Sequence, residues 1–214
     1  MRRPAARVTD LDRDSWEQRW ERVLREQGDR IAQRPPNAHL VALARELPAG
    51  RALDAGCGHG SETLWLATQG WQVTALDFAP TALAHARSAA QALGPDVAGS
   101  IDWVEADLAT WTPQPDAYDL VVCLYVHAAG PVEELVARMA TGVARGGTLV
   151  LVGHRPVDPA TGAATAAAGQ VQVSVEDALA VLDPERWELV LAEERPRPQA
   201  GTGVDAVISA RRRP

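Results

Sequence analysis

Three glycines follow a strand-like run in the segment LDAGCGHG, residues 53–60. Gly56, Gly58 and Gly60 alternate with other residues and come directly before a helical pattern. Glycine lets a ligand approach the backbone, and the first turn of a helix offers free N–H groups. A strand that ends in such a turn therefore predicts a cradle for a cofactor or another small ligand.

The dinucleotide-binding fingerprint is the first alternative for this turn. That fingerprint needs Gly or Ala where this chain has Ser61, and its third glycine would come one residue after Gly60. Asp54 is the stronger argument, because a carboxylate two residues before the first glycine repels a pyrophosphate and favours a ligand with an ammonium group. The turn favours a cationic ligand over a dinucleotide.

The elements around the turn predict an α/β fold. From Gly50 onward, short apolar runs alternate with helical patterns, which is typical of a parallel sheet covered by helices on both faces. Two amphipathic helices are expected before it, the first stopping at Gly28. We expect a helical lid at 1–47 and a catalytic part at 48–214, as one folded domain overall, with a mobile loop at 155–170. Strands are expected at 51–56, 71–77, 101–107, 118–126 and 146–154, followed by a closing antiparallel hairpin at 186–195 and 203–212.

Composition excludes several functions. The 214 residues are 46% hydrophobic, which suits one sizeable core, and a net charge of -7 argues against a nucleic-acid partner. All 21 basic residues are Arg, so Walker A and Schiff-base lysines are absent. Two cysteines and the lack of a long apolar run predict a cytoplasmic protein that does not bind membranes.

The segments LDAGCGHG, ALDFAP, VEADL, YDLVVCLYV and GGTLVLVGH together resemble the motif series of class I S-adenosylmethionine-dependent methyltransferases, over roughly residues 37–153. In detail the chain looks most like the small-molecule branch that includes tellurite-resistance and thiopurine-type methyltransferases. The resemblance implies a Rossmann-like, doubly wound, mostly parallel seven-stranded sheet. It also implies that S-adenosylmethionine is the cofactor, S-adenosylhomocysteine is the product, and the methyl group passes in line to an O, N or S nucleophile of a small molecule.

The resemblance also assigns the cofactor contacts. The glycine turn would hold the methionine part, with Asp54 binding the turn or the amino group, and Asp77 would accept hydrogen bonds from both ribose hydroxyls. Phe78 would pack on the adenine. Asp107 would read the adenine amino group, although an aspartate before LATW also suits a turn cap. The expected cofactor-binding residues are Asp54, Gly56, Cys57, Gly58, Gly60, Asp77, Phe78, Asp107, Leu108 and Cys123.

Candidate catalytic residues follow the fourth and fifth strands. His127 and His154 are candidates for a general base, and Tyr125 is a third. A base matters only when the nucleophile arrives protonated, as an alcohol or phenol does. From the lid, Trp16 and Trp20 either cover the substrate or anchor the core, and Arg34 either holds a carboxylate or is solvated.

Other readings stay open at this point. No metal-ligand cluster is expected after the fourth strand. A module that binds the cofactor without catalysis remains an alternative, since cofactor motifs report binding rather than turnover. A nicotinamide-dependent oxidoreductase is disfavoured by Asp54 and by the glycine spacing. The sequence specifies neither the acceptor nor the oligomeric state.

Overall fold

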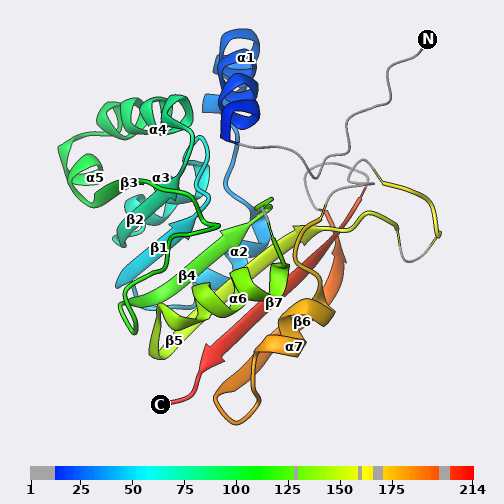
Figure 1. The fold of residues 1–214 in the computed structure, drawn as a ribbon. Coiled ribbons are helices and arrows are strands. Elements are labelled where there is room, and N and C mark those ends of the chain that lie inside the picture. Colours follow the sequence, from blue (N-terminus) through cyan, green and yellow to red (C-terminus); the bar gives the residue numbers. More distant parts are fainter. Residues whose placement is uncertain (1–12, 128–129, 159–160, 166–170, 198–202) are drawn as a thin grey trace, which may run out of the picture.

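A computed structural model describes residues 13–127, 130–158, 161–165, 171–197 and 203–214 (Figure 1). Its sheet has seven strands in the order β3-β2-β1-β4-β5-β7-β6. The strands are β1 Arg51–Ala55, β2 Gln72–Asp77, β3 Ile101–Glu105, β4 Tyr118–Leu124, β5 Val143–His154, β6 Trp187–Pro196 and β7 Val204–Arg212. The helices are α1 Arg13–Ala32, α2 Ala38–Ala44, α3 Ser61–Thr68, α4 Pro80–Ala92, α5 Pro95–Gly99, α6 Val132–Thr141 and α7 Val175–Val181.

The sheet is mostly parallel, as expected. Strands β1 to β5 pair in parallel, whereas β7 pairs antiparallel with both β5 and β6. The closing hairpin is therefore confirmed, with β7 inserted between β5 and β6. The chain order reverses between β1 and β4, and open α/β sheets bind ligands at such a switch point, beyond the carboxyl ends of the strands.

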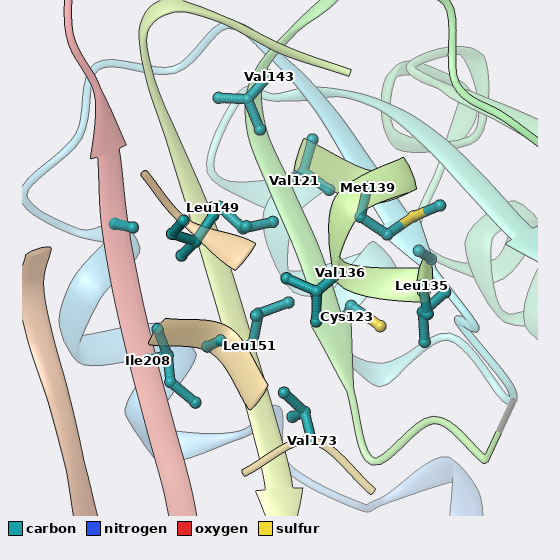
Figure 2. Packing of buried hydrophobic residues seen from close by; sticks show 14 of the residues in the cluster. Val121, Cys123, Leu135, Val136, Met139, Val143, Leu149, Leu151, Val173 and Ile208 are labelled. Atoms are coloured by element: carbon teal, nitrogen blue, oxygen red, sulfur yellow. The ribbon is translucent and has the colours of Figure 1, made fainter. Parts of the chain in front are cut away.

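Side chains of successive strand residues enter two separate apolar cores, because strand residues alternate between the faces of a sheet. In β5, Leu149 and Leu151 pack with α6 and α7, whereas Val150 and Val152 pack with α2 and α3. Figure 2 shows the first core, with Leu149 and Leu151 opposite Val136 of α6. The alternation decides which helix each polar strand residue meets.

The first helix departs from its expected bounds. Gly28 was expected to end it, but α1 continues to Ala32 through a kink at Gln27 (φ -140°, ψ 23°). One residue outside the helical region absorbs the break, so the backbone resumes its helical course beyond Gly28. The first helix is consequently longer than predicted.

Two further differences lie in connecting segments. The short helix α5 was not expected; it begins at Pro95, a residue suited to the first helical turn. Strand β5 begins at Val143 rather than at Gly146, and the pairing of β4 with β5 shifts register between Tyr118 and Leu120. Gly146 has φ +77°, which lets the chain turn within the strand instead of ending it.

The long connection at 155–170 lies only partly within the described residues. Its described part contains an antiparallel bridge between Val157 and Ala164. Residues 159–160 and 166–170 lie outside the described ranges, so the mobility expected of this loop stays a prediction. Among the described residues, no helix is long and apolar enough to cross a membrane.

Candidate functional site

The glycine turn joins β1 to α3 at the carboxyl edge of the sheet. Gly56, Gly58 and Gly60 have φ values of +83°, +51° and +88°, which L side chains rarely adopt. The N–H groups of Gly56 and Cys57 both donate to the carbonyl of Leu76 in β2, at 2.8 and 2.9 Å. The turn is therefore held open in a conformation that favours glycine at three positions.

Asp77, the last residue of β2, is bound to this turn. Its Oδ2 atom accepts a hydrogen bond from the N–H of Gly58 at 2.8 Å, and its Oδ1 atom accepts one from the N–H of Ala79 at 2.9 Å. Burial raises the pKa of Asp77, and these hydrogen bonds oppose that rise. A carboxylate offers about four lone-pair positions, so Asp77 can still accept from hydroxyl groups of a ligand.

Asp54 is buried beneath the turn rather than exposed to it. Only 3% of the residue is exposed, and its Oδ2 atom accepts a hydrogen bond from Thr63 Oγ1 at 2.6 Å. Burial, reinforced by the nearby Glu62 carboxyl, raises the pKa of Asp54 to about 7. Asp54 thus ties β1 to the first turn of α3. Its expected role in holding the glycine turn or an amino group of the ligand stays a prediction.

The residues expected around the adenine lie at the ends of β2 and β3. Phe78 is half-buried, and Leu108 is buried with its Cδ1 atom 3.5 Å from a Cβ placed on Gly56. Asp107 is exposed, and its Oδ1 atom accepts a hydrogen bond from the N–H of Ala109 at 2.8 Å. The Asp107 side chain therefore caps a turn, and a contact with adenine stays a prediction.

Both cysteines are buried and free. Cys57 belongs to the core beside α3, and Cys123 to the core beside α6, where Figure 2 shows it near Val136. Burial raises the pKa of both thiols, that of Cys123 to about 12. They lie in cores on opposite faces of the sheet and stay protonated at neutral pH, which argues against pairing or nucleophilic roles.

Helix α1 lies near the carboxyl edge of the sheet, beside α4 (Figure 1). Its Trp20 ring lies 5.6 Å from the His59 ring, and its Trp16 ring lies 5.4 Å from the His127 ring. Glu17 accepts a hydrogen bond from the N–H of Thr81, the second residue of α4, at 3.1 Å. The two tryptophans, both half-buried, therefore contact histidines at the edge where a ligand is expected. Whether they cover a substrate stays a prediction.

His154 and Asp205 stand directly opposite each other in the antiparallel pair of β5 and β7. His154 Nδ1 lies 3.0 Å from Asp205 Oδ1, and Asp205 is fully buried. Burial alone would raise the pKa of Asp205, but hydrogen bonds from His154, Arg197 and Tyr125 outweigh it and keep that pKa below its usual value. A carboxylate in this position orients the imidazole.

Tyr125 completes a chain of polar contacts. Its hydroxyl donates to Asp205 Oδ2 at 2.8 Å and accepts from Asn37 Nδ2 at 2.8 Å, and its ring stacks on His154 with centroids 4.0 Å apart. Tyr125 has φ +56°, a strained value for a bulky residue. Burial, with the Asp205 charge beside it, raises the pKa of Tyr125. The phenol is thus held protonated, which argues against its predicted role as a base.

His127 reaches the same cluster through Gln172. The Gln172 side-chain nitrogen lies 2.7 Å from His127 Nε2, and the Gln172 oxygen accepts a hydrogen bond from the backbone N–H of His154. Burial lowers the pKa of His127 to about 4, helped by the nearby His154 and Arg19. His127 is therefore neutral at physiological pH.

Arg34 lies in a different place from His154, Tyr125 and His127. It is exposed and lines a cavity of about 230 Å³ between the end of α1, α3 and α4. The cavity is also lined by His59, Ser61 and His85, but by neither Asp77 nor His154. A substrate role for Arg34 stays a prediction. Among the described residues, no group of three or more His, Cys, Asp or Glu side chains is arranged to hold a metal.

Four polar residues that contact His154, Tyr125 or His127 were not predicted as site residues from the sequence. Asp205 had a visible signal, since it is a charged residue near the start of the otherwise apolar run VDAVISA. The other three come from segments far apart in the chain and have no local pattern that marks them. The four residues are Asn37, Gln172, Arg197 and Asp205.

Comparison with known proteins agrees with this architecture. Residues 52–147 match the model of a methyltransferase domain family. Trans-aconitate 2-methyltransferase from Streptomyces avermitilis is 40% identical over 123 residues, which cover 53% of this chain and 43% of that enzyme. The match thus spans less than half the length of that relative.

Two solved structures have a similar fold at low sequence identity. A 1,6-didemethyltoxoflavin-N1-methyltransferase from Burkholderia thailandensis superposes with a TM-score of 0.66 at 20% identity, covering 100% of this chain and 93% of that chain. The cyclase SpnF superposes with a TM-score of 0.70 at 16% identity, covering 94% of this chain and 97% of that chain. The segment that matches the methyltransferase domain family contains the glycine turn and the acidic ends of β1 and β2.

Proposed function

We propose that this protein binds S-adenosylmethionine along the carboxyl ends of β1, β2 and β4 and passes its methyl group to an O, N or S atom of a small molecule. One observation carries the proposal. Asp77 is anchored to the glycine turn through Gly58 and to the start of α4 through Ala79, so its remaining lone pairs have a fixed direction. A pair of neighbouring ribose hydroxyls matches that arrangement.

The remaining cofactor contacts are proposed from the same geometry. The open glycine turn, with Cys57 inside it, would lie against the methionine part, and Asp54 would hold the turn in place through Thr63. Phe78 and Leu108 would enclose the adenine, with Asp107 at its amino group. The backbone of Cys123 would border the methionine end.

When bound, the cofactor supplies a methyl group already activated by a sulfonium. The residues of this chain then need to align the acceptor and exclude water, which supplies about 7–11 kcal/mol in well-oriented reactions. Trp16 and Trp20 are suited to exclude water, because α1 holds both over the ligand edge. His154, Tyr125 and His127 line the acceptor side.

The proposed acceptor is a small molecule. Support comes from relatives and neighbours whose names specify small acceptors, trans-aconitate and 1,6-didemethyltoxoflavin. The acidic net charge disfavours nucleic acid as a partner. We also propose a bacterial, cytoplasmic protein, consistent with free buried cysteines. The division into a lid at 1–47 and a catalytic part at 48–214, and the likeness to tellurite-resistance and thiopurine-type enzymes, stay predictions.

The alternatives have less support. The matched domain family and the relative described above are methyltransferases, which disfavours nicotinamide-dependent oxidation. The similarity to SpnF shows that this fold also occurs in a protein named as a cyclase, so the fold by itself does not establish transfer.

Isothermal titration with S-adenosylmethionine, S-adenosylhomocysteine and NAD tests the proposal. We expect both adenosyl compounds to bind the wild type in the micromolar range and NAD not to bind. Asp77→Ala should lose that binding, whereas Asp102→Ala, an exposed carboxylate on neighbouring β3, should retain it. Binding of NAD in preference to S-adenosylmethionine would refute the proposal.

A further inference from the structure

We infer that His154, oriented by Asp205, is the general base of this site, and that the acceptor is therefore a hydroxyl compound such as a phenol or an enol. The inference rests on the proposed function, since it names the acceptor class for the same site. It depends on which ring nitrogen of each histidine carries the hydrogen.

At His154, the position of Asp205 decides the tautomer. A hydrogen on Nδ1 donates to Asp205 Oδ1 at 3.0 Å and leaves the lone pair on Nε2. Arg197 Nη2 also lies 2.6 Å from Nδ1, and a guanidinium only donates, so the two neighbours compete for this atom. Asp205 is fully buried in β7 and cannot turn away, whereas the Arg197 side chain is 21% exposed and has other N–H groups on Asp205. The fixed carboxylate favours the hydrogen on Nδ1.

At His127, the contact with Gln172 fixes the tautomer, and the free ring nitrogen is a donor rather than an acceptor. The Gln172 oxygen accepts from the backbone of His154, and its nitrogen lies 3.4 Å from the carbonyl of Tyr125, so the amide has one orientation. Its N–H therefore donates to His127 Nε2 and occupies that lone pair. His127 then presents an N–H at Nδ1. One histidine is available to accept a proton and the other to donate a hydrogen bond.

Tyr125 does not compete for the role of base. Its hydroxyl accepts from Asn37, whose own side-chain oxygen is occupied by the backbone N–H groups of His39 and Leu40. The phenolic hydrogen is thereby directed to Asp205. Tyr125 and Asp205 are positioning residues, and His154 is the group that meets the acceptor.

In the proposed step, the acceptor hydroxyl loses its proton to His154 and gains the methyl group. His154 Nε2 takes the proton of the acceptor hydroxyl, and the oxygen uses its electron pair to form the new C–O bond. The C–S bond of the methyl donor breaks and its electron pair stays on sulfur, giving the thioether product. Asp205 stabilises the imidazolium, which then releases its proton to water. A thiolate or a free amine would need no such base, so the pair favours a hydroxyl acceptor.

Nitrogen-15 NMR of the histidine rings tests the tautomers in the protein without ligands. We expect the wild type to carry the His154 hydrogen on Nδ1 and Asp205→Asn to shift it to Nε2, while His85→Gln leaves the His154 signals unchanged. Gln172→Leu should free the Nε2 lone pair of His127. A wild-type His154 protonated on Nε2 would overturn the inference.

Transfer to three probes of similar shape tests the acceptor class. Phenol, thiophenol and aniline differ in the atom that is attacked, and release of S-adenosylhomocysteine reports each transfer. We expect His154→Gln to lower transfer to phenol by about 10²–10⁴-fold, with transfer to thiophenol changed only a few-fold. Equal losses with both probes, or transfer to thiophenol or aniline alone, would overturn the inference. If none of the probes reacts, the NMR result decides.

Titration with S-adenosylmethionine separates the two possible failures. His154→Gln and Asp205→Asn should bind it as the wild type does, because neither residue is placed against the cofactor. If the wild type does not bind it, the proposed function fails. If binding is intact but the tautomer or the acceptor preference is wrong, only the inference fails.

Discussion

The indole of Trp20 lies against Gly58: its Cζ2 atom would stand 2.9 Å from a Cβ placed on that glycine. The lid helix and the glycine turn are therefore in direct contact, and there is no room for a side chain between them. Gly58 also binds Asp77, so a change at this position affects the lid, the turn and the acidic end of β2 together.

We predict that Gly58→Ala destabilises the protein and weakens cofactor binding. The left-handed φ of +51° costs an alanine roughly 1–2 kcal/mol, and the clash with Trp20 adds to it. Gly94→Ala is the matched control. Gly94 also has a positive φ, +110°, but a Cβ placed on it would have no neighbouring atom within 4 Å. Thermal unfolding and calorimetric titration should show reduced stability in both variants but reduced S-adenosylmethionine affinity only in Gly58→Ala.

Adding Trp20→Ala to Gly58→Ala tests the cause. Removing the indole removes the clash but not the backbone strain, so the double variant should regain part of the lost stability. If the two substitutions are simply additive, the contact with Trp20 is not the source of the cost.

Asp54→Asn should remove a dependence of stability on pH. Because the pKa of Asp54 is raised to about 7 in the folded state, the folded protein keeps a proton that the unfolded chain loses above about pH 4. This carboxyl therefore lowers stability progressively from about pH 4 to pH 7, by roughly 4 kcal/mol in full at about 1.4 kcal/mol per pH unit.

Urea denaturation at pH 4.5, 6 and 7.5 checks this prediction. Asp54→Asn should resemble the wild type at the lowest pH and exceed its stability at the highest. Comparing the two proteins at each pH cancels the opposite contribution of His127, whose lowered pKa reduces stability as the pH falls below about 6.5. A constant difference at all three values would contradict the assignment to Asp54.

Tyr125→Phe should destabilise the protein more than it slows transfer. The substitution leaves Asn37 Nδ2 and Asp205 Oδ2 without their shared hydroxyl, at a cost of about 1–3 kcal/mol for buried polar groups. Tyr118→Phe is the control, because the Tyr118 hydroxyl makes only a 3.4 Å contact with Thr74. Urea midpoints and turnover measure the two effects. A loss of turnover as large as that of His154→Gln would restore Tyr125 as a candidate base.

Glu17→Gln should loosen the lid without unfolding the sheet. Glu17 accepts hydrogen bonds from both the N–H and the hydroxyl of Thr81, and its carboxylate favours the positive N-terminal end of α4. Hydrogen exchange should become faster in α1 and stay unchanged in β4 and β5. Gln18→Ala, an exposed change on the same helix, should leave exchange as it is in the wild type. Faster exchange throughout the protein would indicate global destabilisation instead.

Local patterns predicted most of the fold. The alternation of apolar runs and helical periods identified all seven strands. The signal is clearest in central strands such as β4, because burial on both faces leaves a continuous apolar run. The kink at Gln27 and the early start of β5 escaped, because in both places the element continues through a glycine that the sequence pattern treats as a boundary. The short helix α5 was too brief for its periodicity to be recognised.

The same patterns predicted only part of the site. The glycine turn and Asp77 are marked by their position after strands, so their proximity follows from parallel topology alone. Three further residues come from separate segments: Asn37 contacts Tyr125, Gln172 contacts His127 and Arg197 contacts His154. No spacing along the chain records those contacts. Asp205 was detectable as a charge among apolar neighbours, but its partner becomes evident only once β5 and β7 are paired.

The pairing of His154 with Asp205 also links chemistry to folding fidelity. Side chains alternate between the faces of a strand, so a slip of one residue between β5 and β7 would turn the carboxylate toward the core beside α6. A misregistered sheet would then be inactive even if it remained compact. Turnover can accordingly serve as a reporter that distinguishes correctly assembled molecules from those whose strands have paired one position out of place.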